Sequence, residues 1–378
     1  MKVLCLNKIS PVGLKVLPSS YSITEDINEA TAILVRSANM LETVLPENVL
    51  TVARCGAGVN NIPLEPYAKA GVVVFNTPGA NANAVKELTI AGMLLAARDL
   101  RGSMEWVKAN KGDELINKSM EKAKGAFAGT EILGKTLGII GCGAIGALVA
   151  QAAGGLGMHV IGVEPSKATI ERYKDLFPAD MEIVSNDELY ARADYISVHV
   201  PLLDATRGML NKEAFAKMKD GVIIVNCARD AIVNDDDLKE AISAGKVRKY
   251  VTDFPNYKTA NMDGVVAISH LGASTEEAED NCAAMAAKQV VDYIQNGNIV
   301  NSVNYPRIEL GAVNGPRVVV LCEAEAVQPV IDSLNHVGVV KMASGVKGAF
   351  GAVVADVKGA VKAEELKAIA GVKRVRLL

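Results

Sequence analysis

The chain has 378 residues, half of them hydrophobic, and its 40 basic and 43 acidic residues give a formal net charge of -3. A length beyond what one hydrophobic core supports predicts two or three domains. The balanced charge, without blocks of like sign, argues against nucleic acid or an anionic membrane as the main partner. Any anionic ligand must therefore be bound by basic residues gathered locally.

The cysteines and the N-terminus indicate the cellular compartment in which we expect the protein. The 6 cysteines lie far apart, with no C-x-x-C pair and no Cys/His cluster at metal spacing, so we expect reduced thiols and no metal site. The N-terminal "MKVLCLNKIS" is too short for a signal peptide, and no run approaches the ~18 apolar residues of a membrane span. We expect a soluble cytoplasmic protein without a membrane partner.

Short β-branched runs alternate with helical patterns from the N-terminus onward. Continuous apolar strands separated by helices are typical of parallel sheets covered on both faces. Two long helical patterns divide this part of the chain: one follows "NANAVKELT", and the other runs from Ser274 to about Asn296. In order, the predicted strands are "KVLCLN", "AILVRS", "VLTVARCG", "GVVVFNTP", "TLGIIG", "HVIGVE", "DYISVHV", "GVIIVNCA", "YVTDF" and "VVAISH".

The predicted fold is therefore α/β, with two parallel-sheet domains of Rossmann-like or flavodoxin-like type. The first is discontinuous and comprises residues 1–98 and 282–305, and the second comprises residues 99–281. Beyond the Gly/Pro-rich stretch "GAVNGPR" the pattern becomes strand, helix, two strands, helix, strand. This change predicts a third, small α+β domain over residues 316–378.

A glycine motif predicts a dinucleotide site. In "TLGIIGCGAIG", Gly141, Gly143 and Gly146 form G-x-G-x-x-G between a strand and a helix, where backbone N–H groups reach a pyrophosphate. The next strand ends in Glu164, which can bind both ribose hydroxyls and would repel the 2'-phosphate of NADP. The motif favours NAD as cofactor. The alternative is a merely tight turn followed by a surface glutamate.

Polar residues at the strand ends are candidates for chemistry, because ligands of parallel sheets bind beyond those ends. They are His199, Arg229, Asp253 and His270. His270 follows an apolar strand, and an ordinary imidazole pKa near ~6.5 suits a group that takes and returns a proton. The alternative is a hydrogen-bonded histidine that merely ends a strand. His199 is expected to shape the wall of the nucleotide site.

Several motifs together resemble a known family. "GKTLGIIGCGAIG", "ADYISVHVPLLDATRGML", "VNCARDAIVN" and "SHLGASTEEAEDN" resemble, in order and spacing, the NAD-dependent D-2-hydroxyacid dehydrogenases. "ILVRSA", "VARCGAGVNNI" and "GVVVFNTPGANANAVKELT" extend the resemblance to residues 1–305. Within the family, the chain is most similar to members that oxidise D-3-phosphoglycerate. The tail "VKAEELKAIAGVKRVRLL" resembles the end of an ACT-type regulatory domain.

The resemblance implies roles for particular residues. Arg229 would hold the substrate carboxylate as a planar fork, and His270 would be the acid/base. The implied cofactor-binding residues are Gly141, Gly143, Ala144, Ile145, Gly146, Glu164, Val200, Pro201, Thr206, Ala228 and Asp253. The implied substrate-binding residues are Arg36, Arg54, Gly56, Ala57, Gly58, Lys124 and Arg229. For Arg36 and Arg54, a salt bridge between domains is an equal alternative.

The sequence departs from the family pattern at the residue that would pair with His270. The family places a glutamate about five residues after the aspartate equivalent to Asp253, but "TDFPNYKT" offers only Tyr257 or Lys258. Asp253, Glu276 and Glu277 remain open as substitutes.

Two further departures concern loops. Asp230 and Ala231 stand where the family often has two glycines. The tail segment "VVVLCEAEAVQPVI" lacks the glycine-bearing turn of amino-acid-binding ACT domains, which makes serine feedback doubtful and favours a role in assembly.

The expected function is NAD-dependent oxidation of D-3-phosphoglycerate to 3-phosphohydroxypyruvate, the first step of L-serine biosynthesis. The expected partner is a small, phosphorylated 2-hydroxy acid, and the resemblance implies a homodimer or homotetramer. One alternative is a dehydrogenase of another small D-2-hydroxy acid, such as glycerate or lactate. The other is a non-catalytic NAD(H)-sensing protein on the same fold, suggested by the missing glutamate.

Overall fold

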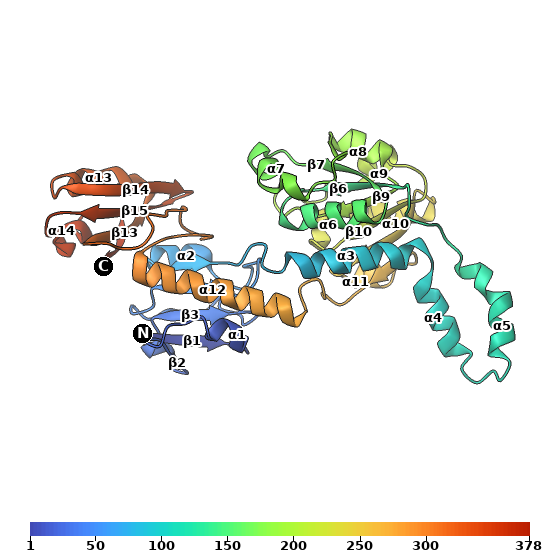
Figure 1. The fold of residues 1–378 in the computed structure, drawn as a ribbon, viewed down its shortest axis with the longest axis horizontal. Coiled ribbons are helices and arrows are strands. Elements are labelled where there is room, and N and C mark those ends of the chain that lie inside the picture. Colours follow the sequence, from blue (N-terminus) through green and yellow to red (C-terminus); the bar gives the residue numbers. More distant parts are fainter. The chain divides into compact units, whose positions relative to one another are not determined.

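The computed structural model describes residues 1–378, which form two compact units (Figure 1). The first unit comprises residues 1–81 and 276–378, and the second comprises residues 82–275. The small C-terminal module thus groups with the first unit. The finer division into three domains, with boundaries near residues 98 and 282, stays a prediction.

The second unit is a Rossmann-type sheet of seven parallel strands in the order β12-β11-β10-β9-β6-β7-β8. Every residue of β10 is buried, as its unbroken apolar run predicts for a central parallel strand. The strands are β6 (Thr136–Ile140), β7 (His159–Val163), β8 (Glu182–Ile183), β9 (Tyr195–Val198), β10 (Val222–Asn226), β11 (Val247–Thr252) and β12 (Val265–Ala267).

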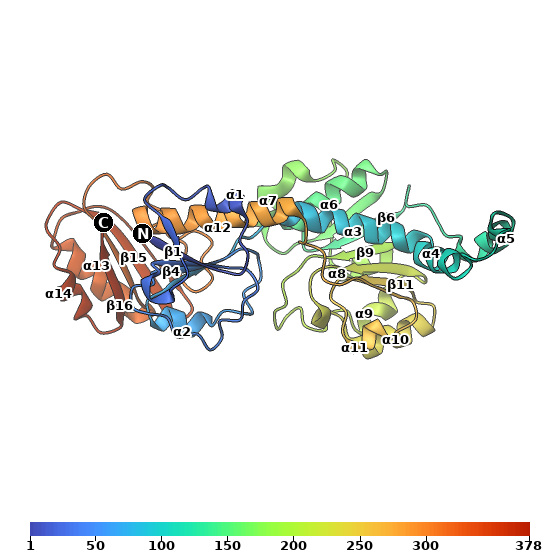
Figure 2. The same cartoon turned by 90° about the horizontal axis from the view of Figure 1, so that it is seen from below.

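Helices cover both faces of this sheet. On one face, α3 (Ala82–Ala97) and α6 (Ala144–Gly155) lie side by side and share a hydrophobic core with the strands (Figure 2). The other face packs against α8 (Asn186–Arg192), α9 (Lys212–Lys217) and α10 (Asp235–Ser243). The short helices α7 (Lys167–Tyr173) and α11 (Tyr257–Ala260) complete the unit.

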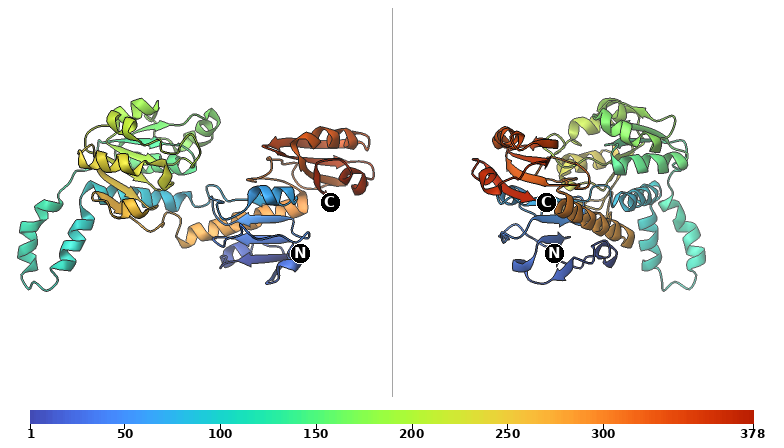
Figure 3. Two further views of the ribbon diagram at one scale, coloured as in Figure 1. Left: turned by 180° about the vertical axis from the view of Figure 1, so that it is seen from behind. Right: turned by 60° about the vertical axis from the view of Figure 1, so that its left-hand side comes forward.

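A helical hairpin projects from the second unit (Figure 3). It consists of α4 (Leu100–Ala109) and α5 (Ile116–Ala123), followed by a 3-10 turn over Lys124–Phe127. Neither helix has a buried residue, although both are amphipathic. The exposed apolar side chains are Met104, Val107, Leu115 and Met120.

The first unit contains a five-stranded parallel sheet in the order β2-β1-β3-β4-β5, as the predicted α/β class requires. Helix α12 (Glu276–Asn296) packs on β3 and β4 and ends where the sequence predicts. The strands are β1 (Lys2–Leu6), β2 (Ser22–Thr24), β3 (Ala32–Val35), β4 (Thr51–Arg54) and β5 (Val73–Phe75), with helices α1 (Pro11–Leu14) and α2 (Leu64–Lys69).

The C-terminal module is an antiparallel sheet in the order β14-β15-β13-β16, consistent with an ACT-like domain. The predicted order of strand, helix, two strands, helix and strand is confirmed. The elements are β13 (Arg317–Glu323), α13 (Val327–Asn335), β14 (Val339–Lys347), β15 (Phe350–Val357), α14 (Ala363–Lys367) and β16 (Val372–Leu377).

The module shares its core with the rest of the first unit. Alternate residues of β13 point to opposite faces: Val318 and Val320 contact α13 and α14, whereas Val319 and Leu321 join the cluster that contains Tyr293 of α12. Both faces of β13 are therefore buried, and the module groups with the first unit.

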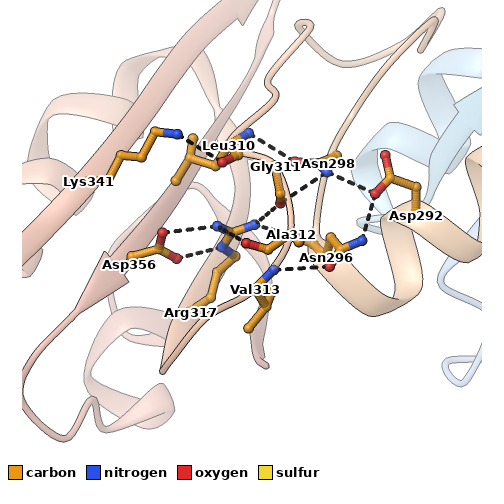
Figure 4. Close-up of polar contacts among 10 residues, drawn as sticks. All are labelled: Asp292, Asn296, Asn298, Leu310, Gly311, Ala312, Val313, Arg317, Lys341 and Asp356. Atoms are coloured by element: carbon orange, nitrogen blue, oxygen red, sulfur yellow. Dashed lines mark hydrogen bonds and ion pairs between the residues drawn. The ribbon is translucent and has the colours of Figure 1, made fainter.

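Arg317 fastens the start of the module to the end of α12 (Figure 4). Its side chain is fully buried and donates to both carboxylate oxygens of Asp356, at 2.6 and 2.9 Å. Nη1 also donates to the backbone carbonyls of Asn296 and Gly311, at 2.8 and 2.7 Å. The charge is thus both paired and hydrogen-bonded, as burial of a guanidinium requires.

None of the helices combines the length and the apolar character that crossing a membrane requires.

Candidate functional site

The three motif glycines occupy the turn between β6 and α6, and two of them, Gly141 and Gly146, are required for steric reasons. Gly141 has φ +92°, and a Cβ there would lie 2.7 Å from the carbonyl oxygen of His199. A Cβ on Gly146 would lie 2.0 Å from the carbonyl oxygen of Gly141, so close packing of helix on strand requires glycine. At Gly143 a Cβ would meet nothing within 4 Å, which leaves the helix N-terminus open to a ligand.

Glu164 lies beside this turn at the end of β7. Its Oε2 accepts from the backbone N–H of Cys142 at 3.1 Å, and its Oε1 accepts from Ser166 N at 3.0 Å. The two bonds fix a carboxylate next to the glycine turn, where the ribose of a dinucleotide is expected. Burial, with a smaller contribution from the nearby Glu164 carboxylate, raises the pKa of the Cys142 thiol to about 12, so this cysteine stays protonated.

The other expected cofactor residues gather along the same edge of the sheet. Strand β6 lies between β7 and β9, so the order of the strands reverses at β6. Ligands of parallel sheets bind at such a reversal. A Cβ on Gly141 would touch Val200 Cγ1 at 2.8 Å, which places Val200 over the turn. Thr206 Oγ1 donates to the carbonyl of Pro201 at 2.6 Å and closes the following loop. Ala144 and Ile145 begin α6, and Ala228 follows β10.

Neutral His199 contributes to this wall. Burial lowers its pKa to about 3, and its Nε2 lies 2.6 Å from Ser197 Oγ. The histidine is therefore an uncharged group, and its role in shaping the nucleotide site stays a prediction.

Arg229 lies beyond the end of β10, where a buried asparagine holds its loop. Asn226 Oδ1 accepts from the backbone N–H of Ala228 and Arg229, and Asn226 Nδ2 donates to Arg229 O at 2.8 Å. Asp230 then begins a 3-10 turn with an ordinary backbone. No positive φ is needed there, which explains why Asp230 and Ala231 can replace glycines.

His270 follows β12 with φ +43°, a left-handed conformation that costs energy for a residue other than glycine. Its backbone N–H donates to Asp253 O at 2.8 Å and to Ile268 O at 3.1 Å. The end of β11 thereby holds the backbone of His270. Its side chain is exposed.

Phe254 brings the two expected catalytic residues together. Its ring centroid lies 4.3 Å from that of His270, and the Arg229 guanidinium carbon lies 5.0 Å from the same ring centroid. Both distances are within the range of aromatic and cation–π contacts. Arg229 and His270 therefore flank one aromatic side chain at the carboxyl ends of β10, β11 and β12.

Asp253 is almost fully buried beside them. Its Oδ2 accepts from Gly272 N at 2.8 Å, whereas Oδ1 is buried without a hydrogen bond, although the Cys227 thiol is near. Burial raises the pKa of this carboxyl. A buried acceptor without a donor fits the expected contact with the carboxamide N–H₂ of a nicotinamide.

The two residues at the position of the missing glutamate do not replace it. Tyr257 is 88% exposed at the start of α11, and the Lys258 ammonium pairs with Asp236 at 2.7 Å. Asp253 accepts from the backbone N–H of Gly272 through Oδ2, and its carboxylate also interacts electrostatically with His270. The His270 imidazole contacts the ring of Phe254.

In the first unit, the expected substrate residues lie at the carboxyl ends of β3 and β4. Arg54 Nε donates to the carbonyl oxygen of Arg36 at 3.1 Å, so the two arginines are neighbours. Arg36 also pairs with Glu279 of α12 at 2.7 Å. Gly56 has φ +155°, a backbone conformation that favours glycine, and begins the loop that continues through Ala57 and Gly58.

Lys124 lies elsewhere. It follows α5 in the projecting hairpin, where its exposed side chain pairs with Glu121. Of the residues in the second unit, the structure thus groups Arg229, His270 and Asp253, but not Lys124.

The sequence alone did not reveal three residues that shape these sites: Phe254, Asn226 and Glu279. An aromatic residue directly after Asp253 was the available signal for Phe254. A polar residue at the end of an otherwise apolar strand was the signal for Asn226. No signal in the sequence pointed to Glu279, because its ion pair with Arg36 joins positions far apart in the chain.

Comparisons with known proteins agree with this geometry. A family model described as the D-isomer specific 2-hydroxyacid dehydrogenase, NAD binding domain, matches residues 90–272. A D-3-phosphoglycerate dehydrogenase of Mycobacterium tuberculosis is 33% identical over 382 aligned residues, which cover 94% of this chain and 69% of that protein. A hydroxypyruvate reductase of Thermotoga maritima is 38% identical over 265 residues, covering 67% of this chain and 81% of the reductase.

A solved structure is also similar. The NAD⁺-bound 3-phosphoglycerate dehydrogenase of Entamoeba histolytica has a TM-score of 0.63 and 26% identity, covering 80% of this chain and 98% of that one. The glycine turn, the placed Glu164 carboxylate and the donor-free Asp253 oxygen fit the NAD that this neighbour contains. The chain therefore belongs to the D-isomer-specific 2-hydroxyacid dehydrogenases and is an oxidoreductase that uses NAD as its cofactor.

Proposed function

We propose that the chain oxidises D-3-phosphoglycerate to 3-phosphohydroxypyruvate and so begins L-serine synthesis. The observation that carries the proposal is the pair of neighbouring arginines, Arg36 and Arg54, in a first unit whose loop 57–59 offers further backbone N–H groups. Two guanidinium groups suit an acid that carries a phosphate in addition to its carboxylate. The name of the Mycobacterium tuberculosis relative supports the same substrate.

In this proposal the residues of the second unit carry out the chemistry. Arg229 binds the C1 carboxylate and the C2 oxygen, and the His270 imidazole takes the proton of the C2 hydroxyl. Bound NAD supplies the acceptor for the hydride that leaves C2. The hydroxyl becomes a carbonyl only if both the proton and the hydride leave, so His270 must lie within hydrogen-bond reach of the hydroxyl. Asp253 orients the nicotinamide through its carboxamide.

Glu164 makes NAD preferred over NADP, and its replacement tests this. In Glu164→Gln we expect the KM for NAD to rise about 10- to 100-fold, because a hydrogen bond to a charged group contributes about 1.5–3 kcal/mol. The KM for NADP should fall relative to that for NAD, because the repulsive charge is gone. The matched control is Glu171→Gln on α7, whose exposed carboxylate pairs only with Lys174. An unchanged ratio of the two KM values would remove Glu164 from cofactor selection.

A second candidate substrate is an unphosphorylated acid, as the name of the Thermotoga maritima relative suggests. The substitution Arg54→Met distinguishes a phosphorylated from an unphosphorylated substrate. If Arg54 binds the phosphate, we expect the KM for D-3-phosphoglycerate to rise at least about tenfold, since a charge-assisted bond is lost. The small activity on D-glycerate should be unaffected. Lys69→Met, which removes an exposed cation of the same unit, is the control. An unchanged KM for D-3-phosphoglycerate in Arg54→Met would favour the unphosphorylated substrate.

Assembly and location belong to the same proposal. The hairpin of α4 and α5 exposes four large apolar side chains and buries none, which supports a homodimer or homotetramer in which it is covered. Lys124, at the base of that hairpin, stays a proposed substrate ligand. The C-terminal module is proposed to be ACT-like and to serve assembly, and the enzyme to be cytoplasmic.

A further inference from the structure

The strongest observation that the proposed chemistry does not use is the position of Phe254. Its ring is half-buried, directly follows Asp253, and contacts both His270 and Arg229. The interplanar angle to the imidazole is 43°, and the guanidinium carbon lies over the ring. One side chain thus touches both groups to which the proposal assigns the chemistry.

The backbone around Phe254 is fixed. Its N–H donates to Thr252 Oγ1 at 3.0 Å, and Thr252 is fully buried. The preceding residue, Asp253, is anchored twice: its carboxylate accepts from Gly272, and its carbonyl accepts from His270. The ring therefore projects from an anchored strand end. Such a group can orient neighbours that are themselves exposed, as His270 is.

The side chains of His270 and Arg229 depend on the Phe254 ring for their orientation. The His270 backbone is in the left-handed region, and Asp253, which interacts electrostatically with His270, makes no hydrogen bond to its imidazole. The Arg229 side chain is held by one hydrogen bond from Nη1 to the carbonyl of Ala228, at 2.6 Å. Without the ring, each side chain would sample several rotamers, and reacting groups that are displaced by about 1 Å can lose about 10²-fold in rate.

We propose that Phe254 is a positioning residue for this reaction, which holds the His270 imidazole and the Arg229 guanidinium against a single aromatic ring. In this role it takes the place of the carboxylate partner that "TDFPNYKT" lacks. The inference rests on the proposed function, since Arg229 and His270 have no task without the oxidation of a 2-hydroxy acid.

The kinetic test compares Phe254→Leu with Phe254→Tyr. Leucine keeps an apolar side chain but loses the aromatic ring, so kcat is expected to fall about 10- to 100-fold, with NADH affinity unchanged. Tyrosine keeps the ring and should restore at least half of the activity. In a His270→Ala background, Phe254→Leu should lower kcat by a smaller factor than in the unaltered enzyme, because only the part of its effect that acts through Arg229 remains.

The matched control is Phe177→Leu, which truncates another half-buried phenylalanine of the same unit, packed against the core of α3 and α6. Its kcat should equal that of the unaltered enzyme. Full activity of Phe254→Leu, or a tyrosine variant as impaired as the leucine variant, would overturn the positioning role.

An NMR measurement tests the contact itself without relying on turnover. The chain has only 4 histidines, so a ¹³C-histidine-labelled sample gives few imidazole signals, and His270→Ala identifies the one of interest. A ring 4.3 Å away should shift that signal upfield, and Phe254→Leu should abolish the shift. If no acid is oxidised but the shift is present, the proposed function fails and the contact stands. If acids are oxidised and the shift is absent, the positioning role fails alone.

Discussion

Replacing His270 by alanine is expected to lower kcat for oxidation of the acid by about 10²- to 10⁴-fold, the usual contribution of a positioned general base. The reason is that the hydroxyl proton then has no acceptor except water. Binding of NADH should be nearly unchanged, because the glycine turn and Glu164 lie at other strand ends. Stopped-flow kinetics and NADH fluorescence titration measure the two quantities separately.

The control for this substitution is His159→Ala, which removes an exposed imidazole at the start of β7, at the opposite end of the sheet from the glycine turn. Its kcat should be unaffected. A loss of less than tenfold in His270→Ala, with NADH binding intact, would mean that another group accepts the proton.

The substitution Arg317→Ala is expected to lower the free energy of unfolding by about 3–5 kcal/mol, because removal of one partner of a buried ion pair leaves the other charge uncompensated. Here the loss would leave the Asp356 carboxylate and the carbonyl of Asn296 without the donors that Arg317 supplies. Since the module shares its core with α12, both should unfold in one transition. Urea denaturation followed by circular dichroism measures the change.

Arg307→Ala is the matched control for Arg317→Ala. Arg307 pairs with Glu309 at 2.9 Å, but both side chains are more than half exposed, and exposed ion pairs contribute about 0–1 kcal/mol. Equal effects of the two substitutions would mean that the buried arginine does not fasten the module. A separate early transition of the C-terminal module in the unaltered chain would argue that it folds independently.

Much of the fold could be predicted from the sequence, because its signals are local. The buried runs of β6, β9 and β10 are continuous and apolar, which marks central strands of a parallel sheet. The spacing of Gly141, Gly143 and Gly146 marks the turn that binds a dinucleotide, since each position forbids a Cβ or leaves room for a ligand. The order of elements in the C-terminal module was likewise visible from its strand and helix patterns.

Features that depend on distant contacts could not be predicted. The sequence offered no sign that Val319 and Leu321 would join the core around α12, because alternation in a strand does not say what covers each face. The ion pair of Arg36 with Glu279 joins the two separate chain segments of the first unit. The contact of Phe254 with both Arg229 and His270 requires three strand ends to meet, and no spacing along the chain encodes that meeting.

The most direct measurement is formation of NADH from NAD and D-3-phosphoglycerate, with a trap for the keto product, beside D-glycerate and D-lactate. We expect turnover with the phosphorylated acid, much less with the other two, and loss of turnover in Arg229→Ala and His270→Ala. Absence of turnover on every acid, in a protein shown to bind NADH, would contradict the proposed reaction. Turnover that survives both substitutions would contradict the assignment of its chemistry to these two residues.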